Sequence, residues 1–459
     1  MSTPTPDAAP KSPLREITQP FVDLIRAPRA LWGINVAYLI EGFCYFGILQ
    51  YLAMYFLQYA GLDDIWSQRS KMVLTAGITI AMFFFGGLAD KWGVRFALLG
   101  AFVLMILGRG LLAFAPELGG SGMTSPMYLL AVGGLLLVVL GYGMYQPAAY
   151  SGVRQFTTPA TAGMGFAMLY ALMNLGGWLP TFMAPMRNKY GIQSAYWFYV
   201  VLTVVSLVVT WLILTRRTVE RARAAAAQET PQKPVPNTAG PDPKAGSGGP
   251  LAWLRNHPLA DPKFTFFIFC LIPVQTLFAY NFGTIQAYVD RAYRGTWIGT
   301  NFEAATNLNA LLIFILVPIV TALTQKQKVY NMMILGTLVM AAPTFLLALG
   351  TNLFTLGGYI VLMTIGEAMW QPRFLQYAAQ IAPEGRTGAY MGVAQLPWFL
   401  TKIVVPLYEG WFLQTYCPQE GVLRTETMWL IFACIAMGSP LLLLLARGWI
   451  GKDFKTKAA

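Results

Sequence analysis

The sequence predicts an all-α membrane protein with twelve transmembrane helices in two six-helix bundles. Of its 459 residues, 56% are hydrophobic and only 11% are charged, and the mean hydropathy of +0.52 is too high for the surface of a soluble domain of this size. Apolar windows of about 20 residues, each long enough to cross about 30 Å of hydrocarbon, can be placed twelve times. One long polar tract separates six of these windows from the other six.

The twelve windows follow one another with short polar connections. In the first half we expect spans at about 31–59, 72–88, 94–114, 127–150, 161–186 and 194–214. In the second half we expect them at about 264–288, 302–323, 329–349, 353–379, 387–413 and 425–445.

These spans divide the chain into five parts. We expect a cytoplasmic N-terminal segment at 1–30, a six-helix bundle at 31–215, a cytoplasmic linker at 216–262, a second bundle at 263–446 and a cytoplasmic tail at 447–459. The linker begins with RRTVERARAAAAQE, which predicts a short helix. It continues as a tract rich in proline, glycine and alanine, which is typical of a flexible connection.

The distribution of basic residues predicts the orientation in the membrane. Of the 32 lysines and arginines, 22 fall on the side of the termini and linker, 7 fall on the other side, and Arg109, Arg373 and Lys402 fall inside spans. The N-terminal residues are polar and proline-rich with no apolar core, so we expect no cleaved signal peptide. The positive-inside rule then places both termini and the linker in the cytoplasm, and we expect a bacterial cytoplasmic membrane.

Several function classes lack the residues that they need. The net charge of +12 forms no continuous basic face, so we expect no nucleic acid partner. The four cysteines have no metal or redox spacing, and the single histidine, His257, lies in the linker. We therefore expect no enzyme, no metal site and no cofactor. No nucleotide-binding motif accompanies the helices, which argues against ATP-driven transport.

Charged residues inside predicted spans are the first functional candidates. A charge at bilayer depth costs several kcal/mol unless it faces a wet cavity or a partner, which marks Glu367 and Arg373 in the tenth span. Glu41 lies about 15 Å from the start of the first span, so both glutamates approach the bilayer midplane. We predict that Glu41 and Glu367 couple transport to protons. The alternative is that these charges form internal ion pairs that only hold helices together.

A short turn between the second and third spans carries a motif. The segment GGLADKWGVRF places three glycines and three charged residues in a cytoplasmic connection, and it resembles the motif of the major facilitator superfamily at that position. The resemblance implies the major facilitator fold and a role in conformational gating. The motif residues are Gly86, Asp90, Lys91, Gly93 and Arg95.

Further stretches are similar to the proton-dependent oligopeptide transporter (POT) family. They are EGFCYFG at Glu41–Gly47, GYGMYQP at Gly141–Pro147, the Tyr170, Asn174 and Gly176 pattern of the fifth span, FAYNFG in the seventh span, Asn309 in the eighth, and Gly366, Glu367 and Pro372 with the turn up to Gly392 in the tenth. The chain departs from the family pattern at Gly42, Gln146 and Ala279, where the family has arginine, lysine and glutamate. It therefore resembles a divergent member.

The resemblance implies a proton-coupled symporter that moves peptides or peptide-like small polar solutes by alternating access, as a monomer in the lipid bilayer. Arg373 or Lys402 is the candidate for an anion site that replaces the missing arginine and lysine. Two alternatives remain open: an exporter of cationic amphiphiles, and a substrate sensor that no longer transports. The predicted substrate-binding residues are Tyr38, Tyr45, Gln146, Tyr170, Asn174, Tyr280, Asn281, Asn309, Trp370, Gln371, Arg373, Trp398 and Lys402.

Overall fold

The computed structural model of the chain describes residues 28–85, 92–157, 162–228, 257–324, 327–381 and 393–450. Within these ranges the ordered elements are helices, and no strand occurs. The N-terminal half contains α2 (Arg29–Tyr59), α3 (Asp64–Phe85), α5 (Val94–Phe114), η1 (Ala115–Leu118), α6 (Pro126–Phe156), α7 (Ala162–Trp178), η2 (Leu179–Met183) and α8 (Ala184–Ile213), followed by α9 (Arg216–Gln228).

The C-terminal half repeats this pattern with more interruptions. It contains η4 (Pro258–Ala260), α11 (Pro262–Phe269), α12 (Ile272–Tyr280), α13 (Thr284–Ala292), α14 (Trp297–Thr300), α15 (Glu303–Thr306), α16 (Leu308–Thr324), α17 (Val329–Ala341), α18 (Thr344–Leu347), α19 (Leu353–Ile381), α21 (Leu396–Tyr416), α22 (Thr425–Leu445) and α23 (Arg447–Ile450).

The helices account for the twelve predicted spans. By length and composition, nine stretches of the described residues suffice to cross a membrane, and one of them, Met168–Ile213, covers the fifth and sixth spans together. A positive φ of 79° at Gly191 separates these two spans. The remaining two spans are α3 and α21, whose charged residues lower their hydropathy. An all-α membrane protein with the predicted helix order is confirmed.

One predicted boundary is wrong in a way that matters for function. We expected the second span to begin at Met72, and we counted Lys71 among the basic residues outside the membrane. In the structure α3 begins at Asp64, and the Lys71 side chain is only 3% exposed. A lysine near the end of an apolar window normally stays in water because its burial is costly. Here a partner on another helix, Glu409, offsets that cost.

The predicted seventh span is broken into three helices. Pro273 stands in the first turn of α12, where a proline interrupts the hydrogen bonding from α11. Asn281, Phe282 and Gly283 then form a turn between α12 and α13. Broken helices are tolerated at membrane depth only where the freed backbone is buried in protein or borders a cavity, so the second break marks a candidate site.

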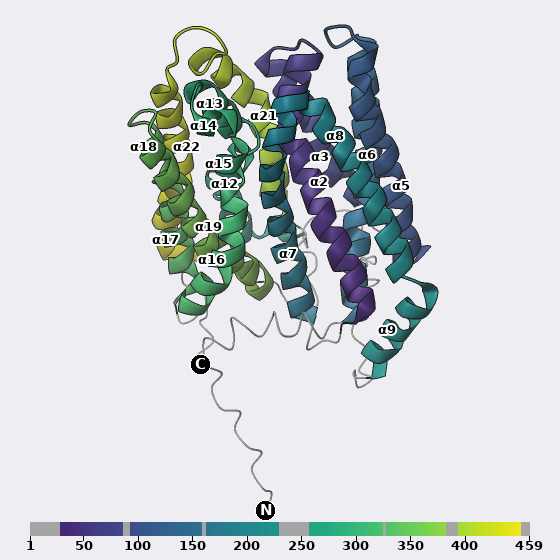
Figure 1. The fold of residues 1–459 in the computed structure, drawn as a ribbon. Helices are drawn as coiled ribbons and strands as arrows, with labels where there is room; N and C mark the ends of the chain where they lie inside the picture. The colour runs from purple at the N-terminus through teal and green to yellow at the C-terminus, as the bar shows by residue number, and fades with distance from the viewer. Residues whose placement is uncertain are drawn as a thin grey trace, which may run out of the picture.

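The two halves stand side by side (Figure 1). In the N-terminal half α2 packs against α7 and α8, and α6 packs against α3 and α5; in the C-terminal half α19 packs against α16 and α17, and α12 packs against α21 and α22. The halves meet chiefly where α3 contacts α21 and α7 contacts α16. We call the end of the bundle that carries α14 the α14 end and the opposite end, which carries α9, the α9 end.

The outer surface is apolar as a membrane protein requires. Large hydrophobic side chains point outward along the helices, including Phe84 at 71% exposure and Phe354 at 89%. The interior combines aromatic packing with a minority of buried charged groups. Polar and charged groups are costly inside a membrane protein, so those that are buried here indicate the candidate functional sites.

Candidate functional site

A pocket of about 130 Å³ lies between the two halves. The N-terminal half contributes side chains of α2 and α3, and the C-terminal half contributes α12, α21 and the turn after α12. Two ammonium groups and one carboxylate face an otherwise aromatic and aliphatic wall. The lining residues are Tyr45, Phe46, Leu49, Lys71, Thr75, Phe278, Ala279, Phe282, Trp398, Thr401, Lys402, Pro406 and Glu409.

An ion pair between Lys71 of α3 and Glu409 of α21 crosses this pocket. The Lys71 Nζ lies 2.6 Å from the Glu409 carboxylate and donates a second hydrogen bond of 3.0 Å to the carbonyl of Phe282. Thr284 donates to the other carboxylate oxygen at 3.2 Å. A Cβ at Gly283 would lie 2.5 Å from the Lys71 Nζ and 2.7 Å from a Glu409 oxygen. The break between α12 and α13 therefore needs glycine to let the pair form.

Lys402 lies two turns before Glu409 on α21, so the two side chains share a face of the helix. Its ammonium group lies 5.4 Å from the centre of the Trp398 ring, a distance at which a cation is attracted to the ring face. Among the described residues no carboxylate pairs with Lys402. This arrangement provides a cation for the negatively charged group of a ligand.

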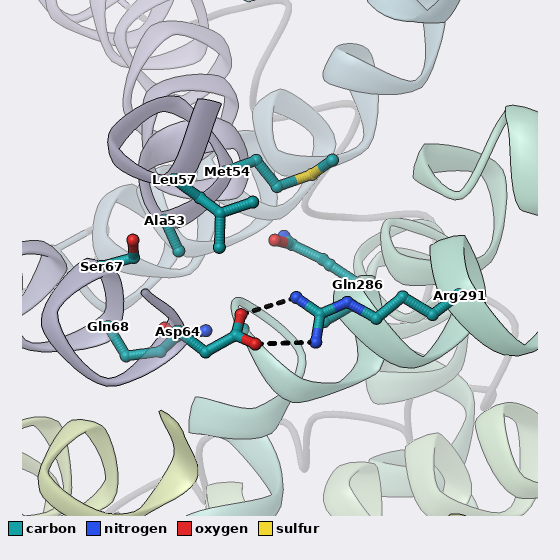
Figure 2. A pocket seen from close by; sticks show the side chains of 10 residues that line it. Ala53, Met54, Leu57, Asp64, Ser67, Gln68, Gln286 and Arg291 are labelled. Atoms are coloured by element: carbon teal, nitrogen blue, oxygen red, sulfur yellow. Dashed lines mark hydrogen bonds and ion pairs between the residues drawn. The ribbon is translucent and has the colours of Figure 1, made fainter. Parts of the chain in front are cut away.

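A second ion pair joins the halves nearer the α14 end (Figure 2). Arg291 of α13 binds Asp64, the first residue of α3, through two hydrogen bonds of 2.6 and 3.0 Å. Arg291 also donates to the carbonyl of Cys417 at 2.7 Å. These groups border a small pocket of about 20 Å³ that Ser67 and Gln286 also line.

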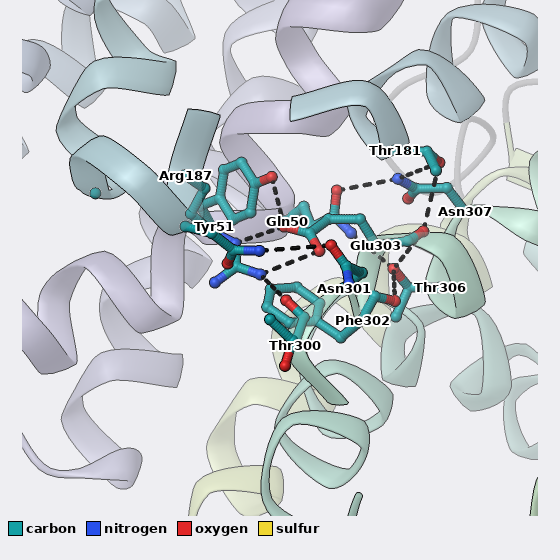
Figure 3. Close-up of polar contacts among 12 residues, drawn as sticks. Gln50, Tyr51, Thr181, Arg187, Thr300, Asn301, Phe302, Glu303, Thr306 and Asn307 are labelled. Carbon is teal, nitrogen blue, oxygen red and sulfur yellow. Dashed lines mark hydrogen bonds and ion pairs between the residues drawn. The ribbon is translucent and has the colours of Figure 1, made fainter. Parts of the chain in front are cut away.

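A third ion pair joins the halves beside α14 and α15 (Figure 3). Arg187, in the first turn of α8, donates to both oxygens of Glu303 at 2.6 and 3.2 Å and to the carbonyl of Thr300 at 2.7 Å. The hydroxyl of Tyr51 from α2 donates to the same carboxylate at 2.8 Å. The Glu303 side chain is fully buried.

Neutral hydrogen bonds extend this third contact. The amide of Gln50 on α2 donates to Thr306 at 2.7 Å and accepts from Asn307 at 3.2 Å (Figure 3). Together with the three ion pairs, these bonds hold the halves together from the α14 end inward to the pocket. Because all of these contacts run between the two halves, this end of the structure is closed.

Glu41, a predicted proton-coupling residue, lies within the N-terminal half. Both carboxylate oxygens accept hydrogen bonds from Arg109 of α5, and the hydroxyl of Tyr142 on α6 donates to one of them at 2.7 Å. Thr203 of α8 accepts a further bond from Arg109. The cluster thus joins four helices of one half and does not line the pocket.

Glu367, the second predicted proton-coupling residue, lies within the C-terminal half. The Asn309 amide on α16 donates to its carboxyl at 2.8 Å and also lies 3.0 Å from the hydroxyl of Thr364. Glu367 is 5% exposed, and no described cation pairs with it. The structure thus brings together Glu367, a predicted proton-coupling residue, and Asn309, a predicted substrate-binding residue, from α19 and α16.

The structure brings together three of the predicted substrate-binding residues, Tyr45, Trp398 and Lys402, in the pocket between the halves. The others lie elsewhere. Arg373 donates to Thr324 at 3.3 Å, and Trp370 is fully buried and donates to the sulfur of Met340. The remaining predicted residues that do not line this pocket are Tyr38, Gln146, Tyr170, Asn174, Tyr280, Asn281, Asn309 and Gln371.

Several of these residues make contacts within their own half of the molecule. Tyr38 stacks on Tyr145, and Gln146 donates to the hydroxyl of Tyr150 at 3.2 Å. Asn174 donates to the Tyr170 carbonyl one turn earlier on α7. Tyr280 is fully buried and shares a hydrogen bond of 2.5 Å with Tyr408. Asn281 is buried, and the side-chain oxygen of Gln371 is buried without a hydrogen-bond partner among the described residues.

Gly42, where the resembled family has arginine, is a point of close helix packing. A Cβ there would lie 3.2 Å from the backbone carbonyl of Met173 on α7, and a Cβ at the facing Gly176 would lie 2.7 Å from the carbonyl of Leu39. An arginine at this position would require α2 and α7 to separate. The departure from the family pattern therefore has a structural reason.

The turn with the predicted gating motif is only partly described. Gly86, Asp90 and Lys91 lie outside the described residues. Gly93 has a φ of 82° and precedes the first residue of α5, and Arg95 follows in its first turn. The positive φ explains why glycine stands at Gly93, since other residues adopt that conformation only with strain.

Two charged residues of this pocket, Lys71 and Glu409, are not among the functional residues predicted from the sequence. Glu409 lies in the predicted eleventh span, so the rule that singled out Glu367 applies to it equally. A second span that begins at Met72 places Lys71 in the preceding loop, whereas α3 begins at Asp64. The pairing itself, between residues 338 apart in sequence, has no local signal.

Two six-helix halves with a charged pocket between them define a helical membrane transporter. A family model of the Major Facilitator Superfamily matches residues 1–177 and 72–406. These matches cover more than half of the sequence, so the chain belongs to the major facilitator superfamily. Because this is a family of transporters, the expectation that the protein is not an enzyme is confirmed. No curated protein sequence matches the chain significantly.

Solved structures of POT transporters share the fold. The POT family transporter PepTSo matches with a TM-score of 0.69 and 17% identity over 93% of this chain and 99% of that chain. The peptide transporter POT in complex with sulfate matches with a TM-score of 0.68 and 19% identity, over 94% of this chain and 96% of that chain. A POT family transporter in complex with 5-aminolevulinic acid matches with a TM-score of 0.67 and 16% identity, over 93% of this chain and 97% of that chain.

Proposed function

We propose that the protein is a proton-coupled symporter that carries peptides or peptide-like small polar solutes by alternating access. The observation that carries this proposal is the pocket between the halves, which contains Lys402 and is closed on the α14 side by three ion pairs. A site near the middle of the membrane, between two halves that are closed at one end, is what alternating access requires.

The chemistry of the pocket supports a zwitterionic or anionic solute. Its lining holds two ammonium groups, Lys71 and Lys402, and one carboxylate, Glu409. Since Lys71 and Glu409 neutralise each other, Lys402 remains for a carboxylate of the solute. The aromatic rings of Tyr45, Phe278 and Trp398 provide a wall for an apolar side chain. The complexes solved for related folds hold sulfate, alafosfalin or 5-aminolevulinic acid, all of which carry an anionic group.

The same chemistry disfavours an exporter of cationic amphiphiles. The formal charge of the pocket lining is +1, which repels a cation. A sensor that no longer transports is suggested by Gly42 and Ala279, where the resembled family has arginine and glutamate, but the pocket and the closed end together suit a transport cycle. We therefore retain the symporter as the proposal.

Proton coupling is assigned to the buried carboxyls. Glu367 has an amide donor and no described cation, and a carboxyl in such a site exchanges its charge for a proton more readily than one that is ion-paired. Glu41 is held by Arg109, so its contribution to coupling depends on that pair opening. We propose Glu367 as the principal coupling residue of the two.

The remaining assignments follow from the charge distribution. We propose an integral membrane protein of the bacterial cytoplasmic membrane, active as a monomer with both termini in the cytoplasm. The α14 end then faces outward, and the parts of the chain keep the boundaries 1–30, 31–215, 216–262, 263–446 and 447–459. Residues 216–228 of the linker form α9, as expected of its start.

Counterflow in proteoliposomes tests the proposed substrate class. Vesicles loaded with a dipeptide should take up labelled dipeptide or 5-aminolevulinic acid, and a pH gradient should drive accumulation. Loss of an anionic group from the solute, as in a dipeptide amide, should abolish competition. Accumulation of organic cations with none of dipeptides would instead establish the exporter.

The anion site is tested by three substitutions compared side by side. Lys402→Ala and Arg373→Ala remove the two candidate cations, and Gln146→Ala is the matched control on the other half. A lost charged hydrogen bond costs about 1.5 to 3 kcal/mol, so we expect the dissociation constant to rise about 10- to 150-fold for the cation that binds. Because Lys402 lines the pocket and Arg373 does not, we expect the larger effect from Lys402→Ala. Equal, negligible effects of all three changes would refute an anion site of this kind.

A further inference from the structure

The ion pair between Lys71 and Glu409 has two properties that the other two inter-half pairs do not combine. Like them, it joins the N-terminal and C-terminal halves. Unlike them, both of its side chains line the larger pocket. It therefore belongs to the closed end and to the candidate binding site at the same time. A change in the charge of this pair would therefore alter both the contact between the halves and the charge of the candidate binding site.

The surroundings of Glu409 contain few charged groups. From α3 it faces Lys71, from α13 the hydroxyl of Thr284, and on its own helix Lys402 lines the same pocket. The hydroxyls of Tyr280 on α12 and Tyr408 on α21 interact with it electrostatically and bond to each other. The neighbouring α22 presents the uncharged ring of Phe432 to Tyr408. Lys71 is the only cation that pairs with it among the described residues.

Opening of the α14 end must separate this pair, because its members belong to different halves. As the halves begin to separate, the ammonium group and the carboxylate lose each other while both are still buried, which is costly for each. A proton relieves the carboxylate, which becomes a neutral acid, and an anionic group of the solute relieves the ammonium group. The uptake of one proton and one anion leaves the charge of the site unchanged.

We propose that Glu409 is a proton-coupling carboxylate whose protonation releases Lys71, opens the α14 end, and leaves Lys71 free to bind the anionic group of the solute in the pocket that Lys402 also lines. The proton adds to a carboxylate oxygen of Glu409, and Lys71 keeps its charge throughout. The inference rests on the proposed transport function and adds a coupling residue to it. It also explains why Lys71 and Lys402 line one pocket.

Accessibility of Ser67 tests this proposal without any substrate. Ser67 lies one turn before Lys71 on α3, is 1% exposed, and lines the small pocket between the halves (Figure 2). In a chain whose four native cysteines are replaced by alanine, Ser67→Cys should react with an impermeant thiol reagent only when the α14 end opens. Ser121→Cys, in the exposed connection before α6, supplies the reference rate at each pH.

The expected result is a pH dependence carried by one residue. If one proton opens the α14 end, the normalised labelling rate should rise as the pH falls, by up to about tenfold for each pH unit. Glu409→Gln should label fast at every pH, and so should Lys71→Met, which keeps the proposal testable if one variant misfolds. Asp64→Asn and Glu303→Gln, which remove the other two pairs, should keep the pH dependence. An unchanged pH dependence in Glu409→Gln and Lys71→Met overturns the inference.

Transport measurements separate this inference from the proposed function. Glu409→Gln should retain counterflow and lose accumulation driven by a pH gradient. If wild-type vesicles accumulate dipeptide but Glu409→Gln does so equally well, the inference fails and the proposed function stands. If labelling follows Glu409 as expected but no anionic solute is transported, the proposed function fails instead.

Discussion

At the scale of single residues, three of the buried glutamates of the membrane region, Glu41, Glu367 and Glu409, have different partners and therefore different properties. Glu41 is fixed by Arg109 and Tyr142 within one half, and Glu367 is fixed by an amide within the other. Glu409 is paired across the two halves. A pair inside one half moves with that half during a rigid-body motion, whereas a pair between halves must exchange partners.

The first residue-scale prediction compares Glu367→Gln with Glu41→Gln. Because no described cation pairs with Glu367, the change to glutamine removes a proton-binding group and breaks no ion pair among the described residues. We expect accumulation driven by a pH gradient to be abolished while counterflow is retained. Glu41→Gln leaves Arg109 buried without its carboxylate, so we expect a partial loss of accumulation together with lower thermal stability.

Uptake driven by a pH gradient and counterflow should be measured in the same proteoliposome preparations, with melting in detergent as the control for folding. If both variants accumulate solute as the wild type does, these two carboxyls are structural. The removal of one partner of a buried pair costs about 3 to 5 kcal/mol, so a Glu41→Gln protein that melts like the wild type would contradict the Arg109 pairing.

At the scale of helices, glycines set how closely neighbouring elements approach. Gly176 on α7 faces the backbone of α2, where an added Cβ would lie 2.7 Å from a carbonyl oxygen and 2.9 Å from the amide nitrogen of Phe43. Backbone atoms cannot move aside as a flexible side chain can. The contact between α2 and α7 therefore excludes any larger residue.

We predict that Gly176→Ala destabilises the protein by about 1 to 3 kcal/mol through overpacking of α2 against α7. The matched control is Gly357→Ala in α19, where an added Cβ meets nothing within 4 Å. That control should be neutral or stabilising, because alanine is favoured over glycine in a helix by about 1 kcal/mol. Thermal melting in detergent measures both. A Gly176→Ala protein as stable as the control would show that α2 and α7 pack less closely.

At the scale of the whole molecule, closure at one end is produced by three ion pairs at increasing depth. Asp64 and Lys71 are seven residues apart on α3, which corresponds to about 10 Å along the helix. Their partners, Arg291 and Glu409, come from two different helices of the other half. Closure of the α14 end therefore depends on several elements at once.

The orientation of the whole molecule is the last prediction. A cysteine at Gly240 in the linker should react with an impermeant thiol reagent only after the membrane is opened, because the basic residues favour a cytoplasmic linker. Ser121→Cys, at the other end of the molecule, should react in intact cells. The reverse pattern would invert the topology and place the α14 end in the cytoplasm.

The sequence alone determined the number and order of the spans, the division into halves, and the candidates Glu41, Glu367 and Lys402. These features follow from hydropathy, a polar linker and the cost of charge in hydrocarbon, which are local properties of the chain. Only the tertiary structure decided which charges meet. Glu41 pairs with Arg109 across 68 residues, and Lys71 with Glu409 across 338, because each pairing depends on how helices are rotated and shifted against one another. No pattern within a single helix encodes that rotation, so the pocket and its ion pair emerge only when the two halves are packed together.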